Sequence, residues 1–105
     1  MKVIITENRL ERIAIKWLND NYGDLESYER DIYPSYIFFK KDDSKIFNYS
    51  KKYGIVVISY GDVWQFLESM FNMDEEQIQD ITKKWIEKQY NLEVNLTTRS
   101  NNPHL

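Results

Sequence analysis

The chain has 105 residues and contains no cysteine, which excludes disulfide bonds, thiolate catalysis and cysteine-ligated metal centres. Its formal net charge of −3 gives no overall attraction to nucleic acid or to an anionic membrane. No apolar run approaches the roughly 18 residues that span a bilayer, and the N-terminal apolar run is too short for a signal peptide. We therefore expect one cytoplasmic domain with a core of its own.

The N-terminal part of the chain predicts an amphipathic helix over residues 7–20. Apolar residues recur there at helical spacing, and Thr6 precedes them as a candidate N-cap. The short run at residues 3–5 is interpreted either as a strand or as an apolar segment that leads into the helix. Residues 24–34 are predicted to form a polar connector, which ends at Pro34 because the residue before proline favours extended geometry.

Three strands are predicted next, at residues 35–40, 45–49 and 54–60, and they form an antiparallel meander. The third is the most apolar and β-branched run of the chain, as is typical of a central strand. If each loop holds four residues, the pairing assigns every side chain to a face. One face then holds Tyr36, Phe38, Phe47, Tyr49, Val56 and Ile58. The other holds Ile37, Phe39, Ile46, Asn48, Ile55, Val57 and Ser59. Both faces are largely apolar, so either helices cover both or a partner covers one.

Two further helices are predicted over residues 63–71 and 75–90. Asp62 with Gln65, and Asp74 with Gln77, have the spacing of a capping box. An alternating segment at 92–97 is predicted as a strand at a sheet edge. The expected fold is α+β, an antiparallel sheet of three to five strands with three helices in the order (β)αβββααβ. Residues 1–98 form one domain, and 99–105 form a polar tail.

The inventory of chemically reactive residues is small. The single histidine, His104, lies next to the C-terminus, so neither a catalytic triad nor a two-histidine metal site is possible in one chain. Asp42-Asp43 suits a hairpin turn. The acidic residues of 24–31 lack the spacing of a calcium loop. We therefore expect no enzyme, no cofactor and no metal site, and an enzyme that uses only carboxylates and tyrosines is the weakest alternative.

Aromatic residues and lysines interleave in the segment 36–53, which has five lysines and two aspartates against a chain of net charge −3. Such a segment can stack bases and neutralise phosphates. The structural explanation is that strand aromatics form the core and that lysines protect sheet edges. Trp64 lies off its helical stripe and either widens the buried face or anchors an interface. The candidate interaction surface comprises Tyr36, Phe38, Lys40, Lys41, Lys45, Phe47, Tyr49, Lys51, Lys52, Tyr53 and Trp64.

Three groups of residues resemble a set of known sequences. They are Ile4-Ile5-Thr6-Glu7 with Lys16-Trp17-Leu18, Ile58-Ser59-Tyr60 with Val63-Trp64 and Phe66-Leu67-Glu68, and Glu76-Gln77-Ile78 with Trp85-Ile86 and Tyr90-Asn91-Leu92. Together they are similar to short proteins of unassigned function from marine bacteriophages and marine metagenomes. The resemblance spans most of the chain and implies a phage or environmental origin. It carries over no activity, cofactor or catalytic residue.

The functional expectation is a small non-enzymatic intracellular protein that acts through protein–protein contact, as a homodimer. Its basis is a sheet with two apolar faces, a high aromatic content and no catalytic inventory. The alternative is a module that binds single-stranded nucleic acid through the lysine and aromatic hairpin 36–53. No membrane partner is expected.

Overall fold

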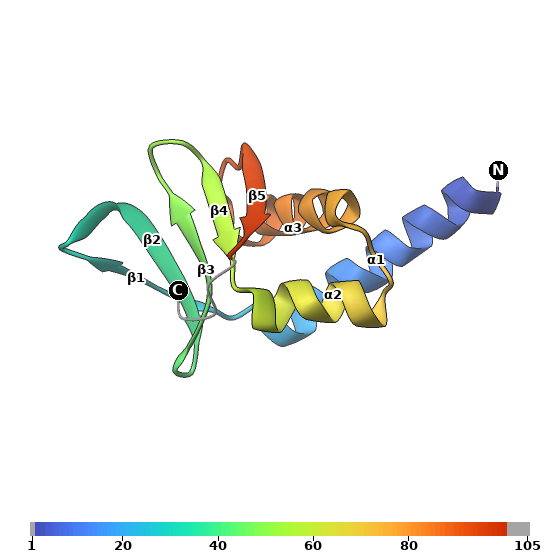
Figure 1. Ribbon diagram of the computed structural model, residues 1–105, viewed down its shortest axis with the longest axis horizontal. Helices are drawn as coiled ribbons and strands as arrows, with labels where there is room; N and C mark the ends of the chain where they lie inside the picture. Colours follow the sequence, from blue (N-terminus) through green and yellow to red (C-terminus); the bar gives the residue numbers. More distant parts are fainter. Residues whose placement is uncertain (1, 101–105) are drawn as a thin grey trace.

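The computed structural model describes residues 2–100, with the side chains of residues 9–59 and 61–100. Its three α helices and five-stranded sheet confirm the predicted α+β class (Figure 1). The elements in chain order are α1 (Lys2–Tyr22), β1 (Glu26–Arg30), β2 (Tyr33–Lys41), β3 (Ser44–Ser50), β4 (Ile55–Ile58), the π-helical turn η1 (Tyr60–Trp64), α2 (Gln65–Met70), α3 (Glu75–Tyr90) and β5 (Leu96–Arg99).

The strands lie in the order β1-β2-β3-β4-β5, and the first four form an antiparallel meander. The last strand, β5, pairs with β4 in parallel, so the prediction of a wholly antiparallel sheet is wrong. A parallel pair requires a long crossover connection, which α2 and α3 supply between these two strands. A strand does lie at this sheet edge, but it spans Leu96–Arg99 rather than 92–97, so it overlaps the prediction at two residues and includes Arg99 of the predicted tail.

The N-terminal expectations need two corrections. Helix α1 begins at Lys2, so residues 3–5 belong to the helix rather than to a strand, and Thr6 is not the N-cap. The predicted connector at 24–34 contains the edge strand β1. Its sequence gave no apolar alternation because four of its five side chains are exposed and only Tyr28 is half-buried.

A β-bulge between β2 and β3 changes the predicted faces. Lys40 pairs with Lys45, but the next pair is Phe39 with Phe47, so Ile46 is the extra residue on β3. The bulge lets Ile46 and Phe47 both enter the core, although they are adjacent in sequence. It also places Phe38 opposite Asn48. The prediction that Tyr36 and Phe38 share a face with Phe47 and Tyr49 is therefore wrong.

The helices lie together on one side of the sheet (Figure 1), and the main core fills the space between. Trp64, Leu67 and Trp85 are buried in it. The capping box of Asp74 and Gln77 is confirmed, with both reciprocal hydrogen bonds formed at 2.9 and 3.0 Å. The predicted cap at Asp62 is wrong, because η1 occupies this position and leads directly into α2.

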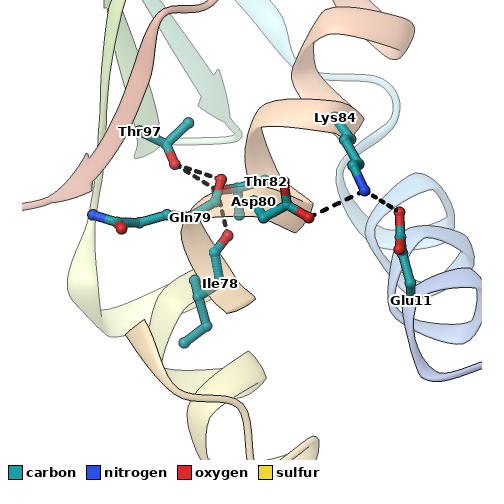
Figure 2. Close-up of polar contacts among 7 residues, drawn as sticks. All are labelled: Glu11, Ile78, Gln79, Asp80, Thr82, Lys84 and Thr97. Carbon is teal, nitrogen blue, oxygen red and sulfur yellow. Dashed lines mark hydrogen bonds and ion pairs between the residues drawn. The ribbon is translucent and has the colours of Figure 1, made fainter. Parts of the chain in front are cut away.

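Polar contacts join α3 to two of its neighbours, β5 and α1 (Figure 2). The buried Thr82 and Thr97 hydroxyl oxygens lie 3.0 Å apart, and Thr97 donates to the Gln79 carbonyl at 2.8 Å, which ties α3 to β5. On the other side Lys84 bridges Glu11 of α1 at 3.0 Å and Asp80 at 3.1 Å. Hydrogen bonding to these two carboxylates raises the pKa of Lys84. These contacts fix α3 against both the sheet edge and α1.

Candidate functional site

The sheet face that lies opposite the helices, called the open face below, has a small aromatic cluster of its own. Phe38 is only 5% exposed although it lies outside the main core cluster. Its cover comes from strand residues: the ring of Tyr28 stacks on it at 5.4 Å, and those of Tyr33 and Tyr36 approach to 6.3 and 6.4 Å. Such aromatic pairs stabilise one another beyond their buried area. The open face is thus ordered without a helix over it.

A cleft of about 420 Å³ is hollowed into the open face, and we call it the aromatic cleft. Its volume lies within the range of small-ligand sites. Its lining residues come only from strands β1 to β4, and they include three aromatic side chains and two cations but no carboxylate. They are Arg30, Tyr33, Tyr36, Phe38, Lys45, Asn48 and Val57. The residues Tyr33 and Tyr36 are 48% and 37% exposed, which leaves them accessible for stacking.

The two cations of the cleft lie against its aromatic rings. The Lys45 ammonium is 4.9 Å from the centroid of the Phe38 ring, and the Arg30 guanidinium is 5.9 Å from that of Tyr33. Burial, and secondarily the neighbouring charge of Arg30, lower the pKa of Lys45. The electrostatic repulsion between these groups favours an anion that binds both of them.

The acidic residues of strand β1, which also supplies Arg30, are engaged outside the cleft. Glu29 pairs with Lys51 at 2.6 Å, and Glu26 lies 3.9 Å from Lys40. These carboxylates therefore neutralise lysines at the periphery rather than the two cations of the cleft. The lining of the aromatic cleft keeps a local positive charge in a chain that is acidic overall.

Asn48 supplies the one polar side chain of the cleft that is uncharged and not aromatic. It lies in the middle of the sheet, paired with Phe38 on one side and Val57 on the other. Its Oδ1 atom is shielded from solvent, and no donor among the described residues reaches it. An unmet buried acceptor costs about 1–3 kcal/mol, so its position calls for an explanation.

The structure brings together only part of the predicted interaction surface. Tyr36, Phe38 and Lys45 line the aromatic cleft, and Lys40 lies beside it with its ammonium 5.7 Å from the Tyr28 ring. The buried residues Phe47, Tyr49 and Trp64 belong to the core on the helix-covered face. Lys41 contacts the Asn21 carbonyl at the end of α1. Lys51, Lys52 and Tyr53 lie in or beside the turn between β3 and β4.

Sequence reasoning missed four residues of the cleft. Arg30 and Tyr33 fall in a segment that was predicted to be a connector, and Asn48 and Val57 were assigned to the other face. For Arg30 and Tyr33 the available signal in the sequence was an aromatic residue, Tyr33, directly before Pro34 and close to the strand predicted at 35–40. No local pattern marks the bulge that brings Asn48 to the open face.

Other parts of the described structure offer less chemistry. Among the described side chains there is no group of three or more potential carboxylate, histidine or cysteine ligands that could hold a metal ion. His104 lies outside the described residues. A shallower groove along α3 and β5 includes Glu76 and Asp80, but Asp80 is paired with Lys84. Within the same residues, none of the helices combines the length and apolar character that crossing a membrane requires.

Comparison of the chain with protein-family models, curated proteins and solved structures gives no match.

Proposed function

We propose that the protein is a non-enzymatic binding protein whose open face binds single-stranded nucleic acid. One observation supports this most strongly: a cleft with exposed aromatic rings and two cations, and without a lining carboxylate. Exposed rings stack on unpaired bases, and neighbouring cations neutralise phosphates. This develops the alternative drawn from the sequence, with a smaller set of residues than the segment 36–53.

The residues of the cleft have two roles in the proposed binding, stacking on bases and contacting phosphates. Tyr36 and Tyr33 offer ring faces for bases, whereas Phe38 is too deeply buried to stack and supports the cleft from beneath. Arg30 and Lys45 are the phosphate contacts. Because only two cations line the cleft and the chain is acidic overall, we expect modest affinity that falls steeply with salt.

The experiment is titration of fluorescently labelled oligothymidine with the protein, followed by anisotropy at low and high salt. Tyr36→Ala should weaken binding roughly tenfold to a hundredfold, since a base–aromatic stack contributes about 1–3 kcal/mol. Tyr53→Ala is the matched control, because Tyr53 is also exposed and has a lysine ammonium 5.3 Å from its ring, but does not line the cleft.

Two results would contradict the proposal. One is the absence of binding at low salt. The other is equal affinity of Tyr36→Ala, Tyr53→Ala and the unchanged protein, which would place any bound oligonucleotide elsewhere.

A homodimer through the open face is the second candidate. It is favoured by Leu96, which is 46% exposed and lies in the same row of that face as Tyr36 and Ile55. Against it, two open faces packed together would bring two copies of Arg30 and Lys45 into one poorly solvated interface. Light scattering behind a sizing column tests this. We expect a monomer at all salt concentrations, and a dimer that persists in high salt would favour the second candidate.

A further inference from the structure

The positive charge that a single strand can use is concentrated at the aromatic cleft. Two cations line the cleft. Outside it, lysines of the neighbouring chain are matched by acids, since Lys40 lies 3.9 Å from Glu26 and Lys51 pairs with Glu29 at 2.6 Å. The turn between β2 and β3 adds the exposed acids of residues 42–43. A protein that follows an extended strand uses cations that track the backbone, whereas here the charge serves one short stretch of a ligand.

The geometry of the two tyrosines suits one base. The ring centroids of Tyr33 and Tyr36 are 6.4 Å apart, and the ring planes are 89° to each other. Bases that follow one another in a stacked strand lie nearly parallel, so two perpendicular rings cannot both continue one stack. A base that lies on one ring meets the edge of the other, which is a favoured aromatic arrangement. The cleft volume of about 420 Å³ is also near the lower end for small-ligand sites.

We propose that the aromatic cleft binds a single nucleotide at the phosphorylated end of a strand. The inference rests on the proposed function and names the part of the strand that the site holds. The base lies in the corner between Tyr33 and Tyr36. The terminal phosphate lies between Arg30 and Lys45.

The charge of a terminal phosphate matches the two cations better than that of an internal one. A phosphate monoester carries about −1.5 to −2 at neutral pH, whereas each internal phosphate carries a single negative charge. The charge of Arg30 acts on Lys45, because it adds to the effect of burial in lowering the pKa of Lys45. One doubly charged group between them relieves this repulsion on both sides. The planar guanidinium of Arg30 is suited to bind two phosphate oxygens at once.

The test is competition against labelled oligothymidine by unlabelled strands that carry a phosphate at the 5′ end, at the 3′ end or at neither. A strand phosphorylated at the end that enters the cleft should compete at about three- to tenfold lower concentration than the unphosphorylated strand. The end that gives the preference identifies the direction of the strand. Thymidine monophosphate should compete as well, whereas inorganic phosphate should compete poorly because it has no base for the tyrosine corner.

Charge-removing variants locate the terminal phosphate. Lys45→Gln and Arg30→Gln should each reduce or abolish the preference for the phosphorylated strand. Lys52→Gln is the matched control and should keep the preference, because Lys52 is exposed and lies 5.3 Å from the ring of Tyr53 but does not line the cleft. Circular dichroism checks that each variant folds.

Four outcomes would overturn the inference. They are equal competition by phosphorylated and unphosphorylated strands, an unchanged preference in both cleft variants, affinity that rises steadily with strand length, and competition by inorganic phosphate equal to that of the nucleotide. If Tyr36→Ala still weakens binding of the strand in those cases, the proposed function survives and only the binding of a phosphorylated end fails. If no strand binds at low salt, both fail.

Discussion

Both faces of the sheet are rich in aromatic residues, but the two faces surround them differently. On the helix-covered face the rings of Phe39 and Phe47 stack at 4.4 Å, and Trp85 and Tyr90 of α3 pack against Phe47. The polar atoms of these side chains have partners: the Trp85 ring N–H donates to Asn19 at 2.8 Å, and the Tyr90 hydroxyl accepts from the Leu25 N–H.

On the open face, strand residues alone cover Phe38, two cations lie against the rings, and the Asn48 acceptor has no partner among the described residues. The comparison teaches that aromatic content by itself does not separate a core from a binding surface. The satisfaction of polar groups and the placement of charge separate them, because a core minimises unmet acceptors and unpaired cations, whereas a ligand can supply partners for the cations of an open cleft.

The largest expected effect tests whether the two faces differ in stability. Phe47→Ala should lower the free energy of unfolding by about 3–5 kcal/mol, because it opens a cavity among buried rings. Tyr36→Ala should cost about 1 kcal/mol or less, since its ring is already partly in water. Urea unfolding measures both. If both variants lost the same free energy of unfolding, the open face would be part of the core and the two faces would not differ in this way.

A second pair of variants compares the polar groups of the two faces. Thr82→Val removes a buried hydroxyl that contacts Thr97 and the Ile78 carbonyl, and should cost about 1 kcal/mol (Figure 2). Asn48→Leu removes an acceptor that has no partner, so the free energy of unfolding should stay constant or rise. Thermal and urea unfolding check both variants, and a destabilised Asn48→Leu would show that the amide is needed for the fold.

The smallest expected effect concerns charge on the open face. Arg30→Gln should raise the pKa of Lys45 part of the way toward its ordinary value, because burial, the larger cause of the lowered pKa, remains. NMR titration of the Lys45 side chain measures this, with Tyr33→Phe as a control that keeps the charge. An unchanged pKa would mean that the two cations do not interact.

The lowered pKa of Lys45 also makes the stability of the protein depend on pH. A lysine whose pKa is lowered in the folded state binds its proton more weakly there than in the unfolded chain. Its contribution to stability therefore rises with pH between the lowered pKa and the ordinary value of 10.5, and is least favourable at neutral pH. Arg30→Gln should reduce this dependence.

Local patterns in the sequence predicted the elements whose cause is local. The apolar periodicity located the three helices to within a few residues, except that α1 begins earlier and α2 is shorter than expected. The reciprocal pair of Asp74 and Gln77 located the start of α3, since a capping box needs only four consecutive residues. Turn residues and β-branched runs predicted the meander of β2, β3 and β4.

The sequence by itself thus determined the α+β class, most elements and the candidates Tyr36, Phe38 and Lys45. Only the tertiary structure decided which residues share a face. The bulge at Ile46 brings Asn48 to the open face, pairing with β2 turns the polar segment of Arg30 into a strand, and the crossover through α3 makes β5 parallel. Each depends on contacts between separate strands, where packing selects one register among alternatives that local propensity leaves nearly equal.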